Sequence, residues 1–202
     1  MSASLSRVLR GGLPMCLAAL LLPGCAAAVR TDSASSYLII DALEASSGAK
    51  PDTFDGTLAS DVLTKGTIYE DDAKVTLRLG MKDPGTATTP TTPSSANYIT
   101  ISQYHVSFVR SDGRNTPGVD VPYAFDGAVT VTVGASVTTA ILPLVRVQAK
   151  DEAPLKALVG GNGALAISTI AEVTFYGKDQ TGRAVSVVGH ISVNFADWGD
   201  PA

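Results

Sequence analysis

Potential ligand-binding side chains are densest in residues 112–127. Carboxylates, a guanidinium, an amide and a phenol occur together there, in Asp112, Arg114, Asn115, Asp120, Tyr123 and Asp126. The prolines and aromatic residues between them are typical of an ordered loop, and loops carry binding residues more often than the strands beneath them. We therefore expect this loop to be the leading binding site. The alternative is that these side chains only build the loop and cover the edge of the core.

Calcium is the metal that the side chains of the expected loops could bind. Aspartates occur in many expected loops, namely Asp52, Asp55, Asp112, Asp120, Asp126, Asp197 and Asp200. Calcium takes about six to eight oxygen ligands. The spacing of a calcium-binding EF-hand loop is absent, however, and aspartate favours turns for backbone reasons. We expect no cofactor, with calcium as the one metal left open.

The sequence contains no recognisable catalytic motif. A Gly-x-Ser-x-Gly turn, a His-Glu-x-x-His helix and a phosphate-binding glycine loop are all missing. The two histidines, His105 and His190, lack the paired spacing of a zinc site and are expected to be partly exposed residues of strands. We therefore do not expect an enzyme.

The elements that must position these residues are expected to be β-strands. Apolar and polar residues alternate with a period of two in residues 75–82, 129–133 and 185–195, which is typical of strands with one buried face. Runs rich in β-branched and aromatic residues predict further strands at Tyr37–Ala45, Tyr98–Arg110, Ile141–Lys150 and Ile167–Lys178. About seven strands indicate an all-β, immunoglobulin-like antiparallel sandwich. A small closed barrel is the alternative.

Turns and helices are expected to be few. Asp179–Gly182 separates the last two strands, which should form a hairpin. One short helix is predicted over Glu152–Gly160, with Asp151 as its N-cap. A second helical turn near Leu58–Leu63 is a weaker expectation. Residues 83–97 consist mainly of Thr, Pro, Ser, Ala and Gly, and predict a mobile loop.

The amino terminus has the features of an export signal. Arg7 and Arg10 precede an apolar stretch that is about half as long as a bilayer-spanning helix. The run Leu21-Leu22-Pro23-Gly24-Cys25 resembles the cleavage site of bacterial lipoproteins. By that resemblance, residues 1–24 are a signal peptide and Cys25 carries a diacylglycerol and a further acyl chain. Ordinary cleavage near residues 26–28 is the alternative and would release a soluble protein.

The resemblance also implies a location and a domain plan. Ala26 follows Cys25 where an aspartate often marks inner-membrane retention, so the outer membrane or cell surface is favoured. Residues 25–36 are expected to be a flexible tether and residues 37–202 a single β-sandwich domain. Since Cys16 leaves with the signal peptide, the mature domain has no thiol for a disulfide.

The net charge and the aromatic residues limit the classes of function to be considered. Without Arg7 and Arg10, the 15 basic residues fall to 13 against 19 acidic ones, a net charge of about −6 that argues against nucleic-acid binding. The only tryptophan, Trp198, follows the last expected strand and either caps the core or offers a ring to a ligand. We expect a non-enzymatic module that binds or scaffolds other envelope proteins. A carbohydrate-binding module using Trp198 or Tyr123 is the alternative.

Overall fold

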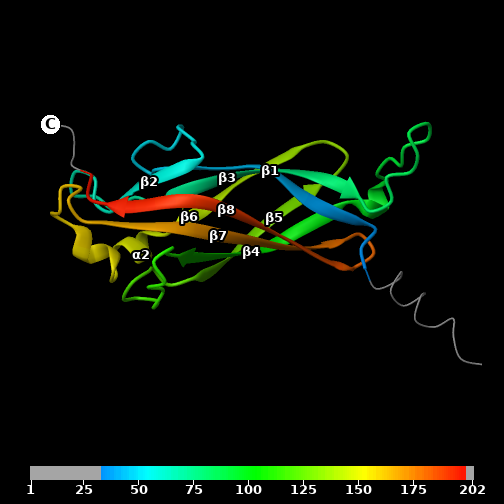
Figure 1. Ribbon diagram of the computed structural model, residues 1–202. Coiled ribbons are helices and arrows are strands. Elements are labelled where there is room, and N and C mark those ends of the chain that lie inside the picture. Colours follow the sequence, from blue (N-terminus) through cyan, green and yellow to red (C-terminus); the bar gives the residue numbers. More distant parts are fainter. Residues whose placement is uncertain (1–32, 199–202) are drawn as a thin grey trace, which may run out of the picture. The chain divides into compact units, whose positions relative to one another are not determined.

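The computed structural model describes residues 33–198, which form two packed β-sheets (Figure 1). One sheet has the order β1-β3-β6, and the other has the order β2-β8-β7-β4-β5. The strands are β1 (Ser36–Ser46), β2 (Thr57–Asp61), β3 (Asp71–Met81), β4 (Ile99–Val109), β5 (Phe125–Val133), β6 (Thr138–Val145), β7 (Ala166–Asp179) and β8 (Ala184–Ala196). The predicted all-β sandwich is therefore confirmed, with eight strands in the described residues.

The order in which the chain visits the two sheets is immunoglobulin-like. One layer consists of the neighbouring strands β1, β3 and β6. In the other layer, β8, β7 and β4 are the central strands, and β5 extends this layer beside β4. One pairing departs from the expected antiparallel pattern, because β2 runs parallel to β8. The predicted hairpin of the last two strands is confirmed, with Ala166 opposite Ala196 and Lys178 opposite Ala184.

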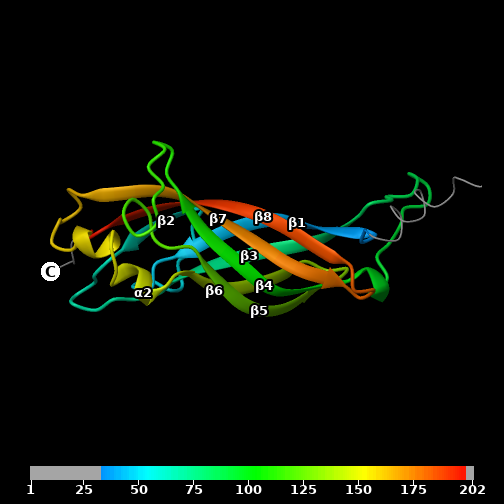
Figure 2. The ribbon, with the colours of Figure 1, turned by 90° about the horizontal axis from the view of Figure 1, so that it is seen from below.

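The core lies between the sheets and is built from the inward residues of the alternating strands. Val75 and Leu77 of β3 are fully buried, as are Ile99 and Ile101 of β4 and Val193 of β8. The residues between them point outward and are more exposed to solvent. Apolar and polar residues therefore alternate with a period of two in these strands. Seen from below, β4, β7 and β8 present a face that none of the helices in residues 33–198 covers (Figure 2).

Two expected helices are corrected by the structure. Leu58–Leu63 is not helical, because β2 occupies residues 57–61 and pairs with β8. The expected helix over Glu152–Gly160 is replaced by an α-helical turn, α2 (Val147–Lys150), and a 3₁₀ turn, η2 (Leu155–Leu158). Asp151 closes α2 as its C-cap instead of starting a helix, since its N–H donates to the carbonyls of Gln148 and Val147.

The boundaries of two further segments differ from the expectation. The strand predicted over Ile141–Lys150 begins earlier and ends at Val145, where the chain turns into α2. The predicted loop at residues 83–97 is exposed along most of its length and contains a short 3₁₀ turn, η1 (Ser95–Asn97). Asn97 ties this turn down, because its side chain donates to Ser35 Oγ at 2.7 Å.

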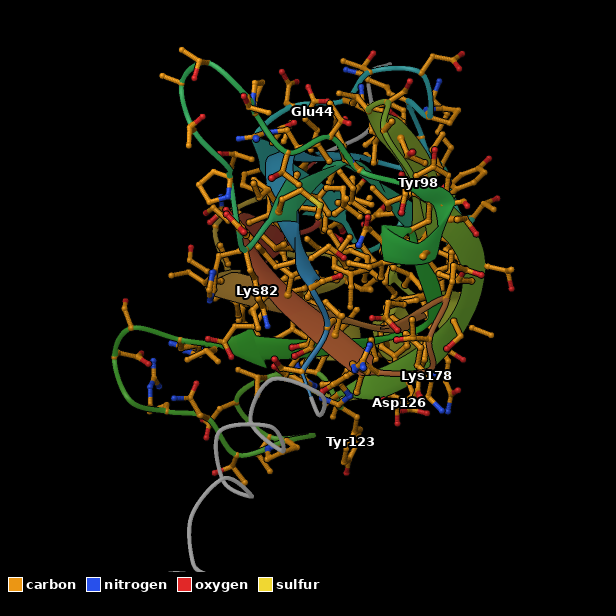
Figure 3. The ribbon with its side chains drawn as sticks, turned by 90° about the vertical axis from the view of Figure 1, so that its right-hand side faces the viewer. Glu44, Lys82, Tyr98, Tyr123, Asp126 and Lys178 are labelled. Carbon is orange, nitrogen blue, oxygen red and sulfur yellow. The ribbon has the colours of Figure 1, made fainter. Side chains whose placement is uncertain are left out.

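The two sheets turn their outer faces in opposite directions. In the view along the strands, Glu44 of β1 lies on one side of the molecule, and Asp126 of β5 lies on the other side with Tyr123 (Figure 3). The β4–β5 loop that holds Tyr123 therefore belongs to the side of the five-stranded sheet. The glycine at position 127 in β5 is required there, because a Cβ atom would collide with the buried ring of Tyr104.

Candidate functional site

The predicted loop site is occupied by its own hydrogen bonds. The Asp112 carboxylate accepts from Arg110 Nη2 at 2.6 Å and from Arg114 Nη2 at 2.9 Å, and it also accepts from the Arg114 backbone N–H. These contacts, led by the bond from Arg110, hold the pKa of Asp112 well below its usual range. The side chain of Asp112 thus works as a brace between two arginines of the same loop.

The other polar residues of this loop also serve its shape. Asn115 Oδ1 accepts from the Arg110 N–H at 2.6 Å, and Asp120 Oδ2 accepts from the Thr116 N–H at 3.2 Å. The ring of Tyr123 lies where a side chain on Gly118 would have to be, and Gly118 has a positive φ of 74°. These contacts are of the kind that the alternative considered from the sequence describes, and a binding role for the loop stays a prediction.

Asp126 and the two histidines form pairs on the outer face of the five-stranded sheet. His105 Nδ1 lies 2.8 Å from Asp126 Oδ1 across β4 and β5. His190 Nε2 lies 3.3 Å from Glu172 Oε1 across β7 and β8. Each histidine has one carboxylate neighbour, and residues 33–198 contain no group of three or more His, Cys, Asp or Glu side chains suited to a metal ion. Asp200 lies outside the described residues.

A cavity of about 690 Å³ lies elsewhere, beside the edge strand β2. Trp198, which the sequence singled out, lines this cavity together with Tyr69, and both rings are close to half exposed. Polar side chains from the segments around β2 complete the wall, namely Ser47, Lys50, Thr53, Asp55, Thr57, Asp61, Thr64 and Lys65. This combination of aromatic surface and a few polar groups is typical of small-ligand sites. None of the loop residues 112–126 lines it.

Asp61 holds the carboxyl-terminal wall of the cavity in place. Its Oδ1 accepts from the Trp198 backbone N–H at 3.2 Å, and its Oδ2 accepts from Thr64 Oγ1 at 2.7 Å. One carboxylate at the end of β2 therefore links the tail that carries the indole to the β2–β3 connection.

A buried ion pair holds two residues of the cavity wall in place. Lys150 Nζ of α2 lies 2.8 Å from Asp71 Oδ1 and donates to the Asp61 carbonyl at 2.9 Å. Asp71 also accepts from the Gly48 N–H at 2.9 Å and from Ser60 Oγ at 2.6 Å. Burial raises the pKa of the Asp71 carboxyl, while the charge of Lys150 and these hydrogen bonds act against it. Gly48 and Asp61 both line the cavity, so the pair fixes two of its walls.

Sequence reasoning missed Tyr69, Lys150 and the cavity itself. Lysine is almost never fully buried, so nothing in the sequence suggested an internal position for Lys150. Tyr69 precedes β3 without any periodic pattern, and it lines the same cavity as Trp198 although the two residues lie far apart in the sequence. No local signal could have joined these two rings.

A second feature of the fold with binding potential is the edge strand β5. It is nine residues long and, within the described chain, pairs only with β4. Its exposed Thr130 and Thr132 alternate with half-buried Val129 and Val131. The free edge of such a strand offers backbone N–H and C=O groups to another extended chain.

Comparisons with known proteins give no relative: no protein-family model, curated protein or solved structure matches this chain. Cys25 and the expected signal peptide lie outside the described residues. Between residues 33 and 198 no helix has the length and apolar character needed to cross a membrane.

Proposed function

We propose that this protein is a non-enzymatic binding module of the cell envelope, anchored by lipid at Cys25, which binds other envelope proteins by adding one of their strands to β5. The observation that carries the proposal is the unpaired edge of β5. Strand addition uses main-chain hydrogen bonds for affinity and alternate side chains for specificity. The alternation of threonine and valine in β5 suits such a partner, because both residues favour extended structure.

The other edges of the two sheets are less suited to strand addition. β2 has five residues, and β6 contains Pro143, which has no N–H to donate. β1 carries the charged Asp41 beside a register shift and is therefore protected in the way that many natural edges are. β5 also has a register shift, opposite Ile101 and Gln103, and carries the charged Asp126 near its start, but its residues 127–133 contain no charged residue and no proline.

The lipid anchor would set the geometry of this function. A protein held by two or three acyl chains stays at the membrane surface, since each buried methylene contributes roughly 0.8 kcal/mol. Partners would then be other proteins of the same envelope layer.

Crosslinking in intact source cells, followed by mass spectrometry, tests the proposal. A photoreactive amino acid at position 130 of β5 should yield a reproducible envelope protein as the crosslinked product. The same amino acid at position 186, an exposed site on β8, serves as the matched control and should not.

With the photoreactive amino acid kept at position 130, replacement of Thr132 by lysine should abolish the crosslink while leaving the fold intact, because edge lysines discourage strand pairing. Crosslinks formed only within the chain, or a partner captured equally from positions 130 and 186, would exclude strand addition at β5.

A further inference from the structure

We infer that the cavity beside β2 is a binding site for a neutral oligosaccharide, with Tyr69 and Trp198 as the surfaces on which sugar rings stack. The inference is independent of strand addition at β5, because the two features lie on opposite edges of the five-stranded sheet. It rests on the aromatic residues, the charge balance and the rigidity of the cavity.

The two aromatic rings supply the apolar part of the site. Trp198 is 44% exposed and Tyr69 is 42% exposed, and both line one concavity. Partly exposed tyrosine and tryptophan side chains offer an apolar ring face together with one polar group, the O–H or the N–H. The C–H faces of a pyranose are a suitable partner, because they are apolar while the ring's hydroxyls point outward.

The polar groups of the wall suit a ligand with many hydroxyls and no charge. Four charged residues line the cavity, two of each sign: Lys50, Lys65, Asp55 and Asp61. Such a wall has no net charge and so does not favour an anion or a cation. The hydroxyls of Thr53 and Thr57 can donate and accept hydrogen bonds, and the carboxylate of Asp55 can accept them. Sugar hydroxyls need partners of both kinds.

A peptide strand fits this edge less well than a sugar. The Asp61 carbonyl at the end of β2 is already bound by Lys150 Nζ. Before β2, Asp55 exchanges backbone hydrogen bonds with Ala45, at 2.8 Å and 3.0 Å. Both ends of the short strand are therefore closed to a backbone ladder, and the side chains of the wall are left to make the contacts.

The cavity is also held in shape before any ligand arrives. Asp61 fixes the backbone of Trp198, and the buried Lys150 and Asp71 fix the positions of Asp61 and Gly48. A site whose walls are held by hydrogen bonds before binding loses less entropy when a ligand binds.

Intrinsic fluorescence offers a direct test, because Trp198 is the only tryptophan in the chain. The full lipidated protein is titrated in a sugar-free detergent with oligomers of N-acetylglucosamine, of β-1,4-glucose and of α-1,4-glucose. We expect a saturable change in Trp198 emission with at least one of these neutral series, and affinity that rises with chain length.

Variants then locate the site. Tyr69→Ala should weaken binding at least tenfold, whereas Tyr123→Ala and Tyr176→Ala, which alter exposed rings outside this cavity, should leave it unchanged. Trp198→Ala should abolish the heat of binding measured by calorimetry. Absence of binding to all three series, or binding that survives Tyr69→Ala, would overturn the inference. None of these outcomes bears on crosslinking from β5.

Discussion

Lys150 and Asp71 form a buried ion pair that joins two segments 79 residues apart in the chain. Their side chains are 1% and 0% exposed, and Lys150 Nζ lies 2.8 Å from Asp71 Oδ1. The pair connects α2 to the first residue of β3, and through Ser60 and Gly48 it reaches β2 and the β1–β2 connection. Four segments of one end of the sandwich therefore meet at a single carboxylate.

Removal of one member of this pair should destabilise the fold strongly. Lys150→Met leaves Asp71 buried without its counter-charge, which typically lowers the free energy of unfolding by about 3–5 kcal/mol. The double variant Lys150→Met/Asp71→Leu should be more stable than Lys150→Met alone, since no uncompensated charge remains. Urea unfolding followed by circular dichroism measures both. A double variant no more stable than Lys150→Met would contradict this view of the pair.

The Asp112 brace should stabilise the loop in a pH-dependent way. Its folded-state pKa is lowered by Arg110 and Arg114, so its contribution is present above the ordinary aspartate pKa of about 4 and is lost as the pH falls below it. Asp112→Asn should lower the urea midpoint at pH 6. The difference from the unmodified protein should shrink between pH 4 and pH 2, as approximate bounds. A difference that stays constant over this range would exclude the brace as its origin.

The contact between Gly127 and Tyr104 should tolerate no side chain. A Cβ at position 127 would fall onto the Tyr104 ring, whose exposure is 2%. Gly127→Ala should therefore destabilise the protein by about 1–3 kcal/mol, as overpacked cores do. Gly56→Ala is the matched control, since a Cβ there meets nothing within 4 Å and should leave stability nearly unchanged. Thermal unfolding compares the two, and equal melting temperatures would contradict the expected clash.

Lipidation at Cys25 predicts a specific change in partitioning. Cys25→Ser should remove the acyl chains, so that labelling with a fatty-acid analogue is lost and the protein leaves the detergent phase of a Triton X-114 separation. Cys16→Ser changes a residue of the expected signal peptide and should have no effect on the mature protein. Label retained in Cys25→Ser would show that another residue is modified.

The strands with one wet face could be predicted from the sequence because their period of two reflects burial alone. β3, β5 and the β7–β8 hairpin belong to this group. β2 was mistaken for a helical turn, because Leu58, Val62 and Leu63 have a spacing that also fits a helix. What makes it a strand is its parallel pairing with β8, more than 130 residues away.

The candidate sites were predictable only in part for the same reason. Trp198 was singled out as a rare residue in a tail, and it does line a cavity. Its companion Tyr69 and the buried Lys150 were not, because their roles depend on contacts between distant segments. The loop expected at residues 112–127 was proposed as a site because of its charges, and local spacing could not predict that Asp112 and Asn115 would also bond to Arg110.

The strand order β2-β8-β7-β4-β5 determines how far apart the two edges of the sheet lie. It separates the two outermost strands by four inter-strand steps of about 4.8 Å, or roughly 19 Å in all. A glycan at one margin and a polypeptide at the other would not compete for space, and a ternary complex is sterically open. Where the glycan and the polypeptide belong to one assembly, binding at one margin would raise the effective concentration at the other, so weak contacts would combine into high avidity.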